Sequence, residues 1–412
     1  MINVEPTIYR LNNGMRVSYL HDPSIVAHLG VTVLAGSRFE NENEEGLAHF
    51  LEHCIFKGTK KRRAFHILSR LDSVGGELNA YTTKEEICIY GSFSKEHFVR
   101  TSELLADITF NSIFPEKEIE KEKEVIIDEI NAYLDSPGDK IFDDFESHLY
   151  NGNPLGNNIL GTANSVRSFT REDLLNYVER FFYPENMVIS FVGDLSANKV
   201  ISRLNKDFGL IAANGVKQHP ISPKGVTPFT IETKEANYQT HIMIGGKAPG
   251  YDDDNRRVMT LLVNILGGPA LNSRLVLSIR EKYGYSYNIE ANYTTYQETG
   301  YWFVYAGTDP KYKKKIVQLI KKEIKKFINQ PLTDNQLQKA KMQMKGHMAL
   351  SMDSNAGLML NFGKSLLVFD QIDTLQEIYE QIDQITAKDI QELAKIYFHP
   401  EELSTLIFNV KD

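Results

Sequence analysis

The two halves of the chain repeat one order of expected elements. In the first half a strand at 31–34 leads through an acidic turn at 40–45 to a helix. In the second half a strand at 240–244 and an acidic turn at 251–254 precede an apolar helix at 258–266. A second helix, a pair of strands and a further helix follow in both halves. Self-similarity of this kind is typical of a duplicated unit, so we expect two domains of one fold.

Length and composition support this division. A chain of 412 residues is longer than one hydrophobic core usually organises. Its 42% hydrophobic and 24% charged residues are typical of a soluble globular protein. The stretch 214–227 is poor in apolar residues, holds two prolines and ends just before a third, which is typical of a linker. We predict a first domain at 1–213, a linker at 214–227 and a second domain at 228–412.

Charge and local composition argue against several classes of partner. The net charge of −8 gives no reason to expect binding to nucleic acid. No apolar run approaches the roughly 18 residues that a membrane helix needs, and residues 1–6 lack the features of a secretion signal. Only Cys54 and Cys88 are present, so no disulfide framework is expected. A cytoplasmic location without membrane association is the default expectation.

One pentapeptide in the first half has the spacing of a metal site. His49 and His53 are four residues apart, so on a helix both imidazoles lie on one face, where they can bind a single zinc ion. Glu52 lies near the same face and can reach a water at that ion. The order His-x-x-Glu-His is the inverse of the commoner zinc-peptidase motif. The corresponding helix at 258–266 has neither His nor Glu, so only the first half is predicted to bind metal.

A third ligand is expected on the long helix that Pro115 opens. Most glutamates of this helix are assigned to a solvated face, but Glu129 stands among apolar residues at 125–127 and 130 that are expected to be buried. Glu122 lies two turns earlier on the same face. Carboxylates directed inward need a cation or hydrogen-bond donors to offset their desolvation. We predict that Glu129 completes the zinc site and that Glu122 bonds behind a ligand histidine.

Further motifs extend this pattern over the whole chain. Glu129 follows His53 by 76 residues, and Glu122 precedes Glu129 by seven. Residues 75–82 read Gly-Gly-Glu-Leu-Asn-Ala-Tyr-Thr, and residues 280–287 read Arg-Glu-Lys-Tyr-Gly-Tyr-Ser-Tyr. The sequence thereby resembles the pitrilysin and mitochondrial-processing-peptidase family of zinc peptidases, in a short two-domain bacterial-type form.

The resemblance implies an α+β fold. Two similar α/β domains, each an antiparallel-rich sheet with helices on one side, would close like a clamshell around a chamber. It implies one Zn²⁺ per chain, held by the first domain. It also implies that Arg280 and Tyr287 reach across from the second domain to bind substrate and stabilise the transition state. Asn79 and Ala80 would lie on an edge strand to which an extended peptide adds by main-chain bonding.

The implied activity is that of a zinc-dependent endopeptidase acting on peptides or unfolded segments inside the chamber. Glu52 would take the proton of the attacking water and later pass it to the leaving amine. The Tyr287 hydroxyl would share in binding the oxyanion, and Arg280 would hold the substrate backbone. By analogy alone, a homodimer is expected.

Three other interpretations remain open. The two histidines could be structural, although their bracketing of a glutamate makes this the weaker interpretation. The same fold also serves as a non-catalytic scaffold or partner subunit in some respiratory complexes, with decayed zinc ligands; here every motif position is intact. A purely structural zinc site would usually have four protein ligands rich in Cys. Cys54 points away from the His face and is expected to lie in the core.

Overall fold

The computed structural model describes residues 5–213 and 220–411. Part of the predicted linker at 214–227, namely 214–219, lies outside the described residues. The chain divides into two compact units that are each discontinuous in sequence. The first unit comprises the chain up to Ile130, Asn157–Ile221 and Leu350–Leu375, and the second comprises Asn131–Gly156, Ser222–Ala349 and the chain from Gln376. No described helix has the length and apolarity that crossing a membrane requires.

A six-stranded sheet in the order β1-β2-β6-β3-β5-β4 organises the first unit. Neighbouring strands are antiparallel except for β2 and β6, which are parallel. A hairpin around Gly14 joins β1 and β2, and β4 forms one edge of the sheet. The strands are β1 (Thr7–Arg10), β2 (Arg16–His21), β3 (Val26–Leu34), β4 (Glu77–Thr82), β5 (Glu86–Ser94) and β6 (Met187–Gly193).

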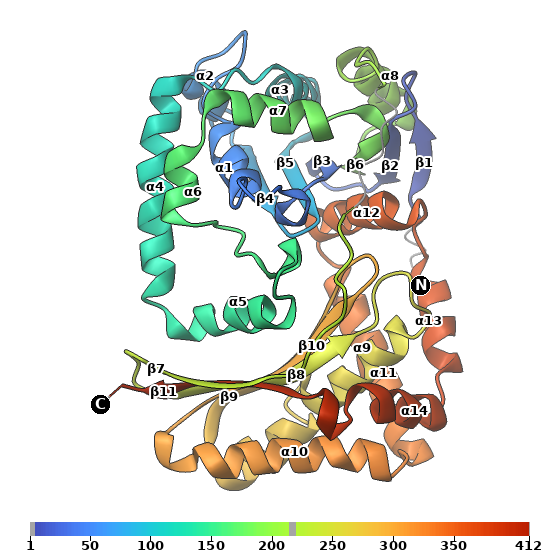
Figure 1. The fold of residues 1–412 in the computed structure, drawn as a ribbon. Helices are drawn as coiled ribbons and strands as arrows, with labels where there is room; N and C mark the ends of the chain where they lie inside the picture. The colour runs from blue at the N-terminus through green and yellow to red at the C-terminus, as the bar shows by residue number, and fades with distance from the viewer. Residues whose placement is uncertain (1–4, 214–219, 412) are drawn as a thin grey trace. The chain divides into compact units, whose positions relative to one another are not determined.

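Helices pack on one face of this sheet and enclose the main core of the unit (Figure 1). Their apolar residues recur at helical spacing, so each helix buries one stripe and exposes its charged face. On α4, for example, Ile119, Ile126 and Ile130 are buried. The helices are α1 (Leu47–Cys54), α2 (Ala64–Asp72), α3 (Phe98–Asn111), α4 (Glu116–Leu134), α6 (Ala163–Ser168), α7 (Arg171–Phe181) and α8 (Ala197–Asp207).

A helix from the second half of the chain, α12 (Asn355–Phe369), covers the other face of the first sheet. Gly363 of α12 lies so close to the sheet that a Cβ atom there would be 2.7 Å from Thr32 Oγ1 and 2.8 Å from Ser190 Oγ. Gly30 on β3 makes room for Met359 in the same way. Glycine on both partners therefore allows the helix and the sheet to approach closely.

The second unit has a five-stranded sheet in the order β7-β11-β8-β10-β9. Only β7 and β11 pair in parallel. Five helices share a core with one face, and α5, from the first half of the chain, packs on the other. The strands are β7 (Thr230–Glu235), β8 (Thr240–Ala248), β9 (Ser286–Thr295), β10 (Gly300–Thr308) and β11 (Ser404–Val410); the helices are α9 (Arg256–Gly267), α10 (Lys313–Asn329), α11 (Asp334–Ser351), α14 (Ala387–Tyr397) and α5 (Pro137–Leu149), with α13 (Leu375–Gln384) beside them.

The two sheets share one topology. The order β2-β6-β3-β5-β4 in the first unit corresponds to β7-β11-β8-β10-β9 in the second, with the parallel pair at the same place. The helices α1, α3 and α4 correspond in chain order to α9, α10 and α11. This confirms the predicted fold class of two similar mixed α and β units. The structure adds a helix on the second face of each sheet, contributed by the opposite half of the sequence.

Candidate metal centre

The start of the motif helix α1 is fixed by a buried carboxylate. Glu40 accepts hydrogen bonds from the backbone N–H groups of Gly46 (3.0 Å) and Ala48 (2.8 Å), which have no partner inside the helix. Burial raises the pKa of Glu40 to about 8, while the two N–H donors act in the opposite direction. The sequence indicated an acidic turn before this helix but did not single out Glu40 as the capping residue.

His49 and His53 lie one turn apart on α1, with ring centroids 4.7 Å from each other. His49 is 9% exposed, and burial followed by the charge of His53 lowers its pKa to about 4. His49 is therefore neutral at physiological pH, which is the state in which an imidazole binds a metal.

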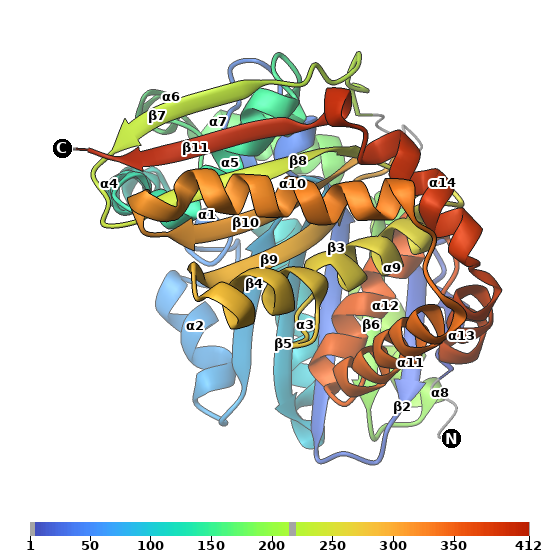
Figure 2. The same cartoon turned by 90° about the horizontal axis from the view of Figure 1, so that it is seen from below.

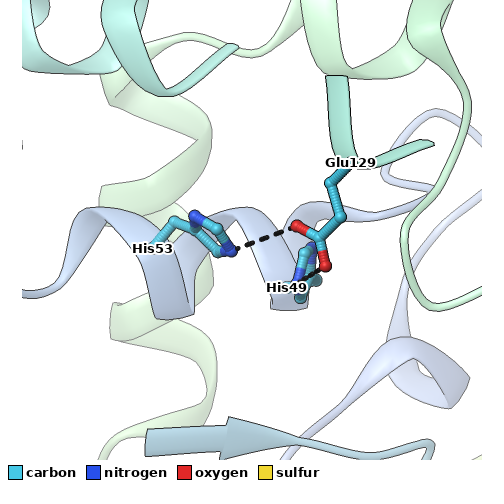
Figure 3. A group of neighbouring side chains, drawn as sticks. All are labelled: His49, His53 and Glu129. Carbon is cyan, nitrogen blue, oxygen red and sulfur yellow. Dashed lines mark ion pairs between the residues drawn. The ribbon is translucent and has the colours of Figure 1, made fainter. Parts of the chain in front are cut away.

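Glu129 of α4 completes a three-residue cluster (Figure 3). Its Oε1 lies 3.9 Å from His49 Nε2, and its Oε2 lies 3.6 Å from His53 Nε2. Within the described part of the chain, this is the one group of three His, Cys, Asp or Glu side chains whose ligand atoms lie within 4.8 Å of one another. The predicted convergence of the two helices on one point is thus observed.

The donor set fits zinc. Two imidazole nitrogens and one carboxylate oxygen are typical ligands of a catalytic zinc with one open position. Tetrahedral zinc holds its donor atoms roughly 3.3–3.6 Å apart, so the Glu129–His distances of 3.9 and 3.6 Å need only small side-chain adjustments. The side chain of Glu129 is 45% exposed, so the cluster is accessible from solvent.

Glu122 stands behind His53, as predicted. Its Oε2 lies 3.3 Å from His53 Nδ1, and its Oε1 lies 2.6 Å from Lys57 Nζ. Glu122 is only 7% exposed. A hydrogen bond from Nδ1–H to this carboxylate fixes the ring and leaves Nε2 free to face Glu129 and a metal. The Nδ1 atom of His49 is buried without such a partner among the described residues.

Glu52 is half-buried between α1 and the edge strand β4. The Thr82 side chain of β4 lies near its carboxylate. Burial raises the pKa of Glu52, and the charge of Glu129 contributes in the same direction, while Thr82 and His53 oppose it. A carboxylate whose pKa moves towards neutrality is suited to exchanging a proton with water.

The neighbouring strand β4 carries the two predicted substrate-binding residues. Asn79 and Ala80 pair with Tyr90 and Ile89 of β5, and the other edge of β4 has no strand partner in the described sheet. Asn79 is exposed, whereas Ala80 packs partly against the core below α1. An extended segment could pair with this free edge.

Arg280 and Tyr287 belong to the second unit. Arg280 lies in a π-helical turn, Val276–Glu281, and Tyr287 lies on the edge strand β9. The Arg280 guanidinium is 5.9 Å from the centroid of the Tyr287 ring, and Tyr287 is 87% exposed. The structure therefore groups the site residues into a cluster in the first unit and an Arg–Tyr pair in the second.

Cys54 is buried in the core of the first unit, as expected. Val125, which was expected to be buried beside Glu129, is instead 49% exposed. The reason is helical geometry, because Val125 is one turn from Glu129 and shares its open face, while Ile126 and Ile130 face the core.

Comparison with known proteins assigns the chain to a family. A family model described as insulinase (peptidase family M16) matches residues 16–163, and one described as the peptidase M16 inactive domain matches 168–344. An uncharacterized zinc protease of Bacillus subtilis is 32% identical over 402 residues, 97% of each chain. The fold is similar to that of a Helicobacter pylori protease (TM-score 0.89, 20% identity, 99% of this chain and 100% of that one). It is also similar to a Pseudomonas fluorescens structure titled peptidase M16 inactive domain (TM-score 0.91, 17% identity, 99% and 98%). The chain thus belongs to peptidase family M16, as its zinc-site motifs suggested.

Proposed function

We propose that the chain is a zinc-dependent endopeptidase that hydrolyses peptides or unfolded polypeptide segments. The observation that carries the proposal is the convergence of His49, His53 and Glu129, with Glu52 beside them on α1. The family membership and the relatives named zinc proteases support the same chemistry. One zinc ion per chain, bound by these three side chains, is part of the proposal.

Zinc bound there would supply a polarised water and a Lewis acid for the scissile carbonyl. Glu52 takes a proton from the attacking water and returns it to the leaving amine. Its place on α1, next to His53, and its burial beside β4 hold the carboxylate in position for this transfer. Glu122 keeps the His53 ring oriented through its Nδ1 atom.

Substrate binding is proposed at the free edge of β4. A peptide that pairs with the backbone around Asn79 and Ala80 is held mainly by groups common to all peptides, so sequence preference is expected to be weak. Arg280 and Tyr287 of the second unit are proposed to contact the substrate backbone and the developing oxyanion when the two units close around it. Such closure into a chamber would exclude folded proteins.

The cellular setting and the oligomeric state are part of the proposal. A cytoplasmic location accords with two cysteines that both remain as buried free thiols. A homodimer is proposed only because the chain has two units of the fold.

Incubation of the purified protein with a mixed pool of unfolded peptides tests the proposal. The metal-replete protein is expected to cleave internal bonds, and a chelator is expected to stop cleavage. Glu52→Gln is expected to lower kcat by roughly 10²–10⁴-fold while the zinc content stays at one per chain. Glu124→Gln, an exposed carboxylate of α4, is the matched control and should leave cleavage unchanged.

The alternative function of a non-catalytic partner subunit has a distinct outcome in the same assay. A protein that holds one zinc per chain and leaves every peptide intact would refute the peptidase assignment. Cleavage that survives both the chelator and Glu52→Gln would refute the assigned site instead.

A further inference from the structure

A cavity of about 260 Å³ in the second unit has none of the residues assigned to the peptidase reaction in its lining. The helices α9 and α11 and the segment that follows α9 form this cavity. Figure 2 shows both helices in the second unit. No Asp or Glu of the described residues lines it. The lining residues are Asn264, Ile265, Asn272, Ser273, Arg274, Leu277, Leu332, Gln336, Lys339, Ala340 and Gln343.

Two buried hydrogen-bonding groups of this cavity have no partner among the described residues. Ser273 is only 5% exposed, and its Oγ atom makes no hydrogen bond to a described residue. The Nδ2 atom of Asn264 is likewise buried and unpaired. A buried polar group that is left unpaired costs free energy, so groups of this kind indicate that something else satisfies them.

Arg274 adds a positive charge that no side chain in the described part of the protein neutralises by direct contact. Its guanidinium lies 4.1 Å from the centroid of the Phe327 ring, and no carboxylate oxygen of the described residues lies within 4.0 Å of it. Glu323 is the acidic residue whose charge acts on the pKa of Arg274, and its carboxylate is itself paired with Lys326 Nζ at 2.7 Å. The guanidinium therefore keeps hydrogen-bond donors available for a ligand.

The rest of the lining gives the cavity a second, apolar character. Ile265, Leu277 and Leu332 line it alongside the polar groups, and Lys339 contributes a further positive charge. Guanidinium, ammonium, hydroxyl and amide N–H groups all donate hydrogen bonds, so donors outweigh acceptors. A ligand that combines a negatively charged oxygen group with a short aliphatic part would complement both the donors and the apolar side chains.

We infer that this cavity binds the C-terminal carboxylate of a short peptide or amino acid whose last side chain is aliphatic. Arg274 and Lys339 bind the carboxylate, Ser273 and Asn264 donate to it, and the aliphatic side chain lies against Ile265, Leu277 and Leu332. Such peptides are products of the proposed reaction, so the identity of the ligand rests on that proposed function, whereas the binding chemistry does not. The volume of about 260 Å³ suits one or two residues and not an extended substrate.

Isothermal titration of the zinc-loaded Glu52→Gln protein tests the inference without any turnover. The probe is N-acetyl-alanyl-leucine, and its C-terminal amide is the uncharged comparison. The acid is expected to bind with a Kd below about 1 mM and the amide at least tenfold more weakly, because the amide removes the charge that Arg274 binds. Because no cleavage is measured, a failure of the peptidase proposal leaves this result interpretable.

Variants locate the binding in this cavity. Arg274→Gln is expected to weaken binding of the acid by at least about tenfold, and Ser273→Ala by roughly two- to fivefold. Lys339→Gln is expected to lower the affinity about twofold, in a salt-dependent way. Lys322→Gln, another exposed helical lysine of the same unit, is the matched control and should change nothing. Binding of the carboxylate at the metal centre would not depend on Arg274.

Several results would overturn the inference. Equal affinities for the acid and the amide, or an unchanged Kd in Arg274→Gln, would exclude recognition of the carboxylate at this cavity. Inorganic phosphate that displaces the acid at lower concentration would assign the cavity to phosphate instead. If Arg274→Gln does not fold, as judged by its melting curve, Ser273→Ala and Lys339→Gln decide the question by the same titration.

Discussion

Replacement of Glu122 by Gln measures what the carboxylate behind His53 contributes to zinc affinity. The Glu122 Oε2 atom lies 3.3 Å from His53 Nδ1, and the residue is 7% exposed. Gln keeps the size of the side chain but removes its charge. The His53 ring then loses a charged acceptor that both orients it and raises the basicity of its Nε2 atom.

The expected loss of affinity is large for a residue that does not bind the metal itself. Partners of ligand histidines typically contribute 10–100-fold to metal affinity. Two features place Glu122 in the upper part of this range. Little solvent reaches it to screen its charge, and within residues 5–213 and 220–411 the Nδ1 atom of His49 has no comparable partner that could compensate. We expect the Kd for zinc to rise roughly 30–100-fold, which corresponds to about 2–3 kcal/mol.

Competition with a fluorescent zinc chelator gives both dissociation constants directly. Glu124→Gln is the matched control, because it makes the same chemical change on the exposed face of α4. Lys57→Met is a second control, because Lys57 contacts the other oxygen of Glu122 but not the histidine. A Kd for Glu122→Gln within threefold of the unsubstituted protein would refute the reasoning, since the hydrogen bond to His53 would then contribute nothing to metal binding.

Three further predictions follow from burial and packing. Gly363→Ala should destabilise the protein by about 1–2 kcal/mol in urea unfolding, because its Cβ would collide with the sheet, whereas Gly346→Ala, with open space around it, should stabilise by about 0.5–1 kcal/mol. In metal-free protein the lowered pKa of His49 means that the unfolded chain binds more protons between about pH 6.5 and 4. Stability should therefore fall by about 3 kcal/mol as pH decreases through this window, and His49→Asn should remove that contribution in unfolding curves recorded at several pH values. The Cys54 and Cys88 thiols are buried with raised pKa values, so a thiol reagent should label neither until the protein is unfolded; fast labelling of the native protein would contradict the packing.

The parts of the site that the sequence predicted are those that local geometry determines. An i, i+4 spacing places His49 and His53 on one face of any helix, and an i, i+7 spacing does the same for Glu122 and Glu129. The sequence alone did not determine that α1 and α4 meet, because this depends on their packing over a common sheet.

The features that were not predicted depend on contacts between distant segments. The positions of α5 and α12 on the second faces of the sheets depend on sheet surfaces formed by the opposite half of the sequence. No periodicity in α12 distinguishes a helix that packs on its own half from one that does not. Gly363 allows α12 to approach the first sheet closely, but a glycine inside a helix does not indicate which sheet the helix packs on. Glu40 was missed for a related reason, since an acidic turn offers several carboxylates and only the fold selects one.

The duplicated units show how one arrangement of helices can recognise opposite charges. Between α1 and α4 the first unit gathers acceptors, namely the imidazole nitrogens of His49 and His53 and the carboxylate of Glu129, so a cation is needed to complete the cluster. Between the corresponding helices α9 and α11 the second unit gathers donors, including Arg274 and Ser273, which an anion would satisfy. The fold itself does not determine the charge of the ligand, because both pairs of helices cover the same face of the same type of sheet. The side chains placed between the helices decide it, and the loss of the metal ligands from the second half therefore need not have left that half without a ligand of its own.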